Sequence, residues 1–129
     1  MAEYSIYDPI ELRITDQVVH HRLIGTAYDI VFVGVMYATN KGDFRIEFEN
    51  LETGEVIIAK EPRFQIRERV GSKGAIRYAT VGIEKRGEYA IRFVNIEDLK
   101  TDRSMLPPMR WVFPLPLKPE KIKVLIRRC

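Results

Sequence analysis

The chain has 129 residues, which is enough for one domain, residues 1–129, that buries a core without disulfide bonds or a structural metal. Apolar residues make up 46% of it and charged residues 30%, a composition that excludes an intrinsically disordered chain. The longest apolar run, residues 30–38, is far shorter than the roughly 20 residues of a membrane-spanning helix. The net charge of +3 comes from interspersed charges of both signs, so it permits an anionic partner without requiring one.

The single cysteine, Cys129, stands at the C-terminus and has no partner for an internal disulfide. The N-terminus shows no positively charged start followed by an apolar segment, so nothing there resembles a signal peptide. We therefore expect a cytoplasmic protein with a free thiol at Cys129, while secretion of a processed form stays open. Arginine (13) outnumbers lysine (8), and Asn, Gln and Ser together number only eight, which favours heat adaptation.

Short segments in which apolar and polar residues alternate follow one another along the chain. They fall at residues 10–15, 18–24, 27–38, 44–49, 56–60, 63–70, 76–83, 88–94, 110–113 and 122–127. Turn signals separate several of them, at residues 40–43, 51–54 and 71–74. About eight to ten strands at this spacing are more than a five-stranded barrel uses. We expect an all-β fold, an antiparallel β-sandwich of jelly-roll or related Greek-key topology, with little or no helix beyond one turn at residues 95–99.

Residues 76–95 have the pattern of a β-hairpin. A tight turn at residues 85–87 joins two apolar arms, and Gly87 permits a positive φ there. Within the first arm the inward parity changes between Tyr78 and Val81. Since a one-residue slip moves every side chain to the other face, this change predicts a bulge near residues 79 and 80.

A second segment, which begins at Ile30 and ends at Tyr37, is apolar on both faces. One face carries Ile30, Phe32 and Met36, and the other carries Val31, Val33, Val35 and Tyr37. Such a strand is either covered on both sides or meets a partner. We expect it to pack against another subunit, as a homo-oligomer, or under the proline-rich segment at residues 106–119. Gly34 in its middle predicts a bulge or a close backbone approach.

No catalytic motif is recognisable in the sequence. His20 and His21 are adjacent and point to opposite faces of a strand, so they are poorly placed to bind one metal ion together. No serine lies in G-x-S-x-G, and no glycine-rich phosphate loop occurs. We therefore expect a non-enzymatic module that acts through protein assembly or ligand binding and needs no cofactor. A hydrolase using loop carboxylates stays open, and Glu97, Asp98 and Asp102 are the candidates both for that and for a calcium site.

Two features indicate a ligand if the protein binds one. An arginine-rich strand face is predicted, and if neighbouring strands add to it, the patch suits phosphate, sulfate or an acidic polymer. Its residues are Arg63, Arg67, Arg69, Arg77 and Arg92. The lone tryptophan, Trp111, offers an alternative as a stacking platform for a sugar. Nucleic acid is not expected, because the aromatic residues alternate inward and are not offered for base stacking.

Overall fold

The computed structural model of the chain describes residues 9–15, 18–35, 37–40, 42–61, 66–71, 73–102 and 122–128, and the structural statements below concern these residues. They form eleven strands and one short 3₁₀ turn. The elements are β1 (Ile10–Arg13), β2 (Val18–Leu23), β3 (Ala27–Val33), β4 (Tyr37–Asn40), β5 (Arg45–Asn50), β6 (Val56–Ile58), β7 (Ile66–Val70), β8 (Lys73–Gly82), β9 (Gly87–Val94), η1 (Ile96–Asp98), β10 (Leu99–Asp102) and β11 (Lys123–Arg128). None of the described segments is a helix long and apolar enough to cross a membrane.

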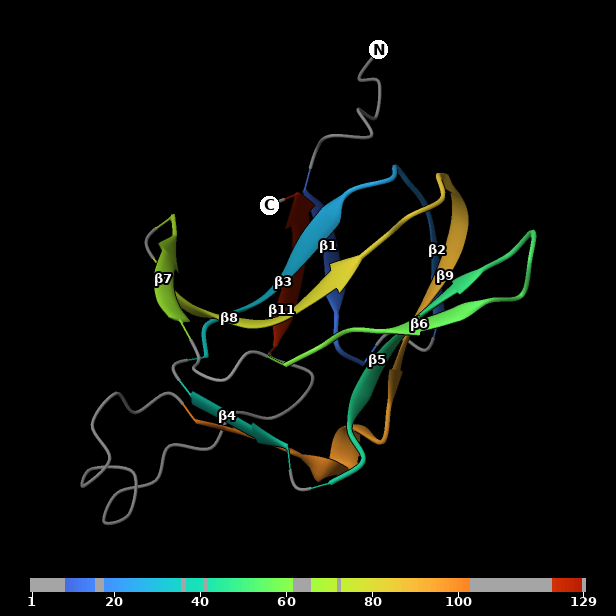
Figure 1. The fold of residues 1–129 in the computed structure, drawn as a ribbon. Helices are drawn as coiled ribbons and strands as arrows, with labels where there is room; N and C mark the ends of the chain where they lie inside the picture. The colour runs from blue at the N-terminus through green and yellow to red at the C-terminus, as the bar shows by residue number, and fades with distance from the viewer. Residues whose placement is uncertain are drawn as a thin grey trace.

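The strands build two packed sheets and a small third one (Figure 1). Sheet A has the order β1-β11-β3-β8-β7, sheet B has the order β2-β9-β5-β6, and β4 pairs with β10. Four antiparallel pairs nest inside one another along the chain: β1 with β11, β2 with β9, β3 with β8, and β5 with β6. This nesting is the jelly-roll arrangement, so the predicted antiparallel all-β sandwich is confirmed.

Side chains from the facing sides of sheets A and B fill the space between the two sheets. The predicted alternation is confirmed on several strands. The buried residues Ile10, Leu12, Ile14, Phe44, Ile46, Phe48, Ile122, Val124 and Ile126 all belong to this core. At its centre Phe32 stacks on Tyr78 with ring centroids 4.5 Å apart. Phe44 sets its ring edge-on to both, so aromatic packing joins the two sheets.

The predicted hairpin at residues 76–95 is wrong. Its two arms are β8, which pairs with β3 and β7 in sheet A, and β9, which pairs with β2 and β5 in sheet B. The segment therefore crosses from one sheet to the other, and Gly87 does not take a positive φ. A hydrogen bond of 2.6 Å from the Tyr89 hydroxyl to the Lys85 carbonyl holds the crossover. The predicted bulge is confirmed, because the register between β3 and β8 shifts opposite Tyr78, next to the expected position.

The strand predicted at residues 27–38, which includes the segment that is apolar on both faces, is two strands, β3 and β4. Gly34, with φ of 84°, ends β3, and its N–H donates to the Gly74 carbonyl at 2.7 Å, which is the predicted close backbone approach. After this turn Val35 packs into the main core, on the opposite side from the one expected. β4 then pairs with β10, a strand in a region predicted to have none. The predicted helical turn is confirmed as η1, preceded by Asn95 at φ of 58°.

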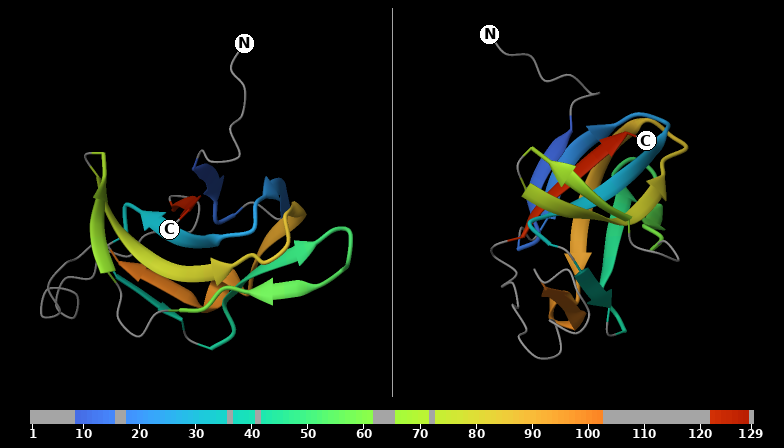
Figure 2. Two further views of the ribbon diagram at one scale, coloured as in Figure 1. Left: turned by 45° about the horizontal axis from the view of Figure 1, so that its top comes forward. Right: turned by 90° about the vertical axis from the view of Figure 1, so that its left-hand side faces the viewer.

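The outer face of β3 is covered within the chain. Val31, Val33, Ala75 and Leu125 form a second buried cluster on this face of sheet A, with Val70 of β7 packed against it. Figure 2 shows β8 as a long curved strand that carries β7 up out of the plane of the sheet. Glu68 of β7 reaches Arg127 of β11 in an ion pair, although β8 and β3 lie between them in the sheet order. Since neighbouring strands are about 4.8 Å apart, only a strongly curled sheet permits that contact.

Candidate functional site

The predicted basic face does not form one patch. In the pairing of β7 with β8, Arg67 lies opposite Ile76 and Arg69 lies opposite Gly74. Residues opposite each other point to the same face, so both arginines lie on the face of sheet A that carries the core residue Ile76. Arg77 pairs with Ile66 on the other side of the same sheet. Ile66 is 48% exposed on that outer side. A one-residue step along a strand reverses the face, which separates arginines that lie close in sequence.

Arg92 belongs to sheet B, and it is engaged in an ion pair there. Its Nη2 lies 2.6 Å from Glu49 Oε1 on the neighbouring strand β5. Arg77 is engaged as well, with Nε 3.3 Å from Asp29 Oδ2 and Nη2 3.6 Å from Glu68 Oε2. The Nε contact is an ion pair without hydrogen-bond geometry. Both arginines are therefore already paired with carboxylates of their own sheets. Arg63 and Trp111, which were also predicted as binding residues, lie outside the described residues.

The predicted acidic loop shows one structural role. Asp98 Oδ2 accepts a hydrogen bond of 3.0 Å from the backbone N–H of Asp43, which ties η1 to the β4–β5 connection. Glu97 is exposed, and the side chain of Asp102 lies outside what is described. Within the described part of the chain, no three His, Cys, Asp or Glu side chains gather in a group suited to a metal ion.

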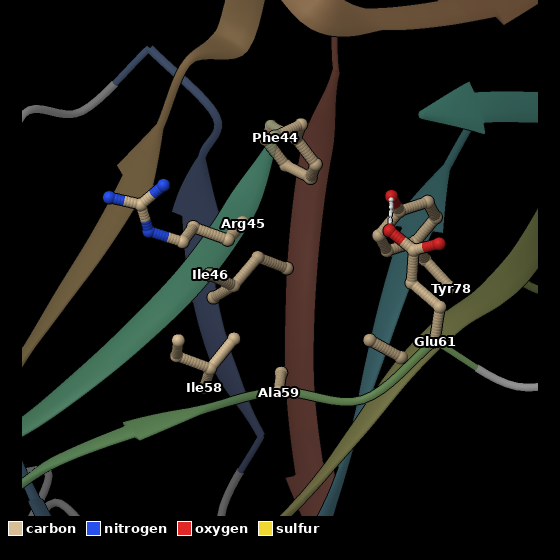
Figure 3. Close-up of a pocket in the computed structure, with 8 residues that line it drawn as sticks. Phe44, Arg45, Ile46, Ile58, Ala59, Glu61 and Tyr78 are labelled. Atoms are coloured by element: carbon tan, nitrogen blue, oxygen red, sulfur yellow. Dashed lines mark hydrogen bonds between the residues drawn. The ribbon is translucent and has the colours of Figure 1, made fainter. Parts of the chain in front are cut away.

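A small cavity opens between the two sheets beside β6 (Figure 3). Its volume is about 310 Å³, at the small end of ligand pockets. It is lined by Phe44, Arg45, Ile46, Ile58, Ala59, Glu61, Tyr78 and Ala79. The walls are therefore mostly apolar. Arg45 turns away from Glu61 in Figure 3 and is paired with Glu47 at 2.6 Å, so Glu61 is the charged group of this cavity that has no ion pair among the described residues.

Glu61 is the centre of a hydrogen-bond cluster at one end of the cavity. Its Oε1 accepts a bond of 2.6 Å from the Tyr78 hydroxyl and one of 2.7 Å from Asn40 Nδ2. Burial, and then the adjacent Glu61 carboxylate, raise the pKa of Tyr78 far above its usual value. The Tyr78 hydroxyl therefore keeps its proton and donates it in the hydrogen bond to Glu61 at the end of the mostly apolar cavity.

The β5–β6 hairpin presents a different kind of site, an open strand edge. In Figure 2 this hairpin projects from the body of the sandwich. Leu51, Val56 and Ile58 are 45%, 47% and 51% exposed, and all three belong to it. β6 ends the order of sheet B, so one of its sides faces no described strand. A projecting hairpin with an apolar surface and an open edge is a typical protein contact.

The backbone parity of β6 can be read from its hydrogen bonds. Asn50 N–H donates to the Glu55 carbonyl at 2.8 Å, and Ala59 N–H donates to the Ile46 carbonyl at 3.0 Å. In an antiparallel ladder every second residue points its N–H and C=O groups to the same neighbour, so Glu55, Ile57 and Ala59 all point theirs toward β5. Val56 and Ile58 therefore turn their N–H and C=O groups away from β5. Lys60 also turns its N–H and C=O groups away from β5, and these groups form hydrogen bonds of 2.8 and 2.9 Å with the backbone of Thr80 in sheet A.

Among the described strands, four end sheets A and B, and β6 is the one of these four that has no charged residue. The others carry charged residues: Glu11 and Arg13 in β1, Arg22 in β2, and Arg67, Glu68 and Arg69 in β7. Charges on an edge strand oppose pairing with another chain. β6 consists of Val56, Ile57 and Ile58 and has none.

Sequence reasoning missed both the cavity and the open edge. The uncharged β-branched run at residues 56–58, between Gly54 and Pro62, was the available signal for the edge. It could not say that this strand would end a sheet, since strand order depends on pairing between distant segments. Glu61 and Tyr78 are 17 residues apart, and no spacing rule connects them.

These features define a jelly-roll sandwich that has a small polar-rimmed cavity and an uncharged open edge at β6. The sequence matches no protein-family model and no curated protein, and no solved structure matches the chain.

Proposed function

We propose that the protein is a non-enzymatic β-sandwich module that acts by protein–protein assembly, with the β5–β6 hairpin as its contact surface. The observation that carries this proposal is the combination at one hairpin of three exposed apolar side chains with an edge strand that has no charge. Burying apolar surface is the main driving force of association, and an open ladder adds directional hydrogen bonds.

Two findings favour the hairpin over the other predicted modes. The homo-oligomer predicted through the segment from Ile30 to Tyr37 stays a prediction, but Val31 and Val33, which motivated it, are already buried inside the chain. A hydrolase would need two carboxyl groups facing each other across a cleft. Asp98 is instead bonded to the backbone of Asp43, and Glu97 is exposed.

The test is light scattering coupled to size-exclusion chromatography over a concentration series, with Ile58→Lys as the disrupting variant. Val18→Lys is the matched control, because Val18 is 46% exposed on the same outer face of sheet B but at the opposite edge. We expect the wild type and Val18→Lys to assemble and Ile58→Lys to stay monomeric. A wild type that is monomeric throughout, or equal disruption by both variants, would overturn the proposal in favour of another mode of action.

A second candidate function is the binding of a small organic cation in the cavity beside β6. It is favoured by Glu61, an exposed glutamate that lines one end of the mostly apolar cavity, while Arg45 is paired with Glu47. An alkylammonium ion would place its charge near Glu61 and its chain against Ile46 and Ala59.

The test of the cation site is an NMR titration with butylammonium and, separately, butyrate. We expect saturable shifts around the cavity with the cation alone. Glu61→Gln should weaken them, and Glu52→Gln, an exposed glutamate outside the cavity, should not. Equal shifts with both ions, or no saturation with either, would reject this candidate.

A further inference from the structure

We infer that the partner of β6 is a second copy of the same chain, paired antiparallel about a two-fold axis that passes through Ile57. This inference rests on the proposed assembly function and specifies its partner and register. In a two-fold contact the same patch occurs on both sides, so the patch must be complementary to itself. The β6 edge meets that requirement in its backbone and in its side chains.

The backbone allows one register. Val56 and Ile58 are the residues of β6 that turn N–H and C=O toward the open edge. If Val56 lies opposite Ile58 of the second copy, the two residues exchange both hydrogen bonds, and symmetry repeats the exchange. Four inter-chain hydrogen bonds result, and they use the donors and acceptors that β6 presents.

The neighbouring registers fail because they require backbone groups that are already used. A shift toward the hairpin tip would place Ile58 opposite Gly54, whose N–H donates to the Asn50 carbonyl at 2.7 Å in a turn with φ of 77°. A shift the other way would place Val56 opposite Lys60, whose N–H and C=O are bonded to Thr80. A one-residue shift would put inward Ile57 beside outward Ile58 and so turn one sandwich upside down.

The side chains agree with the register that the backbone selects. Val56 and Ile58 both stand on the outer face of sheet B, opposite Glu49 and Glu47 in their own chain. In the two-fold pair each Val56 lies beside Ile58 of the second copy, which makes two apolar cross-strand pairs. Both residues are about half exposed in the single chain, so this contact removes apolar surface from water on each side.

The register is tested with two double variants that carry charges at the same two positions. In Val56→Lys/Ile58→Lys every new cross-strand pair joins like charges. In Val56→Lys/Ile58→Glu each lysine faces a glutamate of the other copy, but in this register alone. The dissociation constant of the dimer is measured by sedimentation equilibrium, and circular dichroism confirms that each variant is folded.

We expect Val56→Lys/Ile58→Lys to weaken the dimer by about tenfold or more relative to Val56→Lys/Ile58→Glu. Equal weakening in the two variants would overturn the register while leaving assembly through the hairpin in place. A wild type that never dimerises would instead overturn the proposed assembly by self-association, so the two failures are distinguishable.

Discussion

Replacing Leu125 by alanine tests whether the outer face of sheet A is a second core of the single chain. Leu125 is 8% exposed and packs with Val31, Val33 and Ala75 beneath β7. The substitution removes three carbon atoms, worth about 2.4 kcal/mol of transfer free energy at about 0.8 kcal/mol each. The cavity left behind adds to this, although a site near the surface collapses in part. We expect a loss of about 2.5–3 kcal/mol in the free energy of unfolding.

Urea denaturation at two protein concentrations measures this effect, and Val18→Ala is the control, because Val18 lies outside the proposed β5–β6 contact surface. The control also truncates an aliphatic side chain, but one that is 46% exposed, so its cost should stay below about 1 kcal/mol. Dimerisation through β6 would raise the midpoints of the wild type and of Leu125→Ala alike, so the loss caused by the substitution should be the same at both concentrations if the chain covers Leu125 by itself. A loss below about 1 kcal/mol for Leu125→Ala, or a loss that differs between the two concentrations, would refute the covered outer face.

Two further predictions concern the backbone at Gly34 and the hydroxyl of Tyr78. Gly34→Ala should lower the free energy of unfolding by about 1–2 kcal/mol, because φ is 84° at this residue. Gly42→Ala is the control: its surroundings are equally open and its φ is not positive, so it should lower the free energy of unfolding much less. Equal losses for the two variants in urea denaturation would contradict this. The unfolded chain releases the Tyr78 proton above about pH 10, whereas the folded protein keeps it. The contribution of Tyr78 to the free energy of unfolding is therefore complete below that pH and declines above it, by about 1.4 kcal/mol per pH unit. Tyr78→Phe should remove this part of the alkaline slope, and parallel pH profiles for the two proteins would contradict the assignment.

The alternation of side chains was predictable because it is a local property of a strand. Phe44, Ile46 and Phe48 face the core as their spacing indicates, and so do the inward residues of β11. The bulge beside Tyr78 was predictable for the same reason, since a parity change within one strand leaves a trace in the sequence.

Pairing between strands was not predictable, because it depends on segments far apart in the chain. The connection at residues 85–87 has the composition of a hairpin turn, yet it crosses between sheets: its first arm, β8, pairs with β3, and its second arm, β9, pairs with β2. The distribution of the predicted arginines over two faces was not predictable for a related reason. Sequence places Arg67 and Arg77 on neighbouring strands, but the ladder sets them on opposite sides of one sheet.

The jelly roll limits how far β6 can assemble. Beyond Ala59 the chain turns to sheet A, where Lys60 bonds to Thr80 and joins the two sheets at that side. The open part of the edge is therefore bounded by that bridge on one side and by the Gly54 turn on the other. One two-fold contact uses both of the residues, Val56 and Ile58, that turn toward this edge. Since no open β6 edge would remain after pairing, the proposed contact would close on itself as a dimer, whereas a longer uncharged edge would favour open-ended growth.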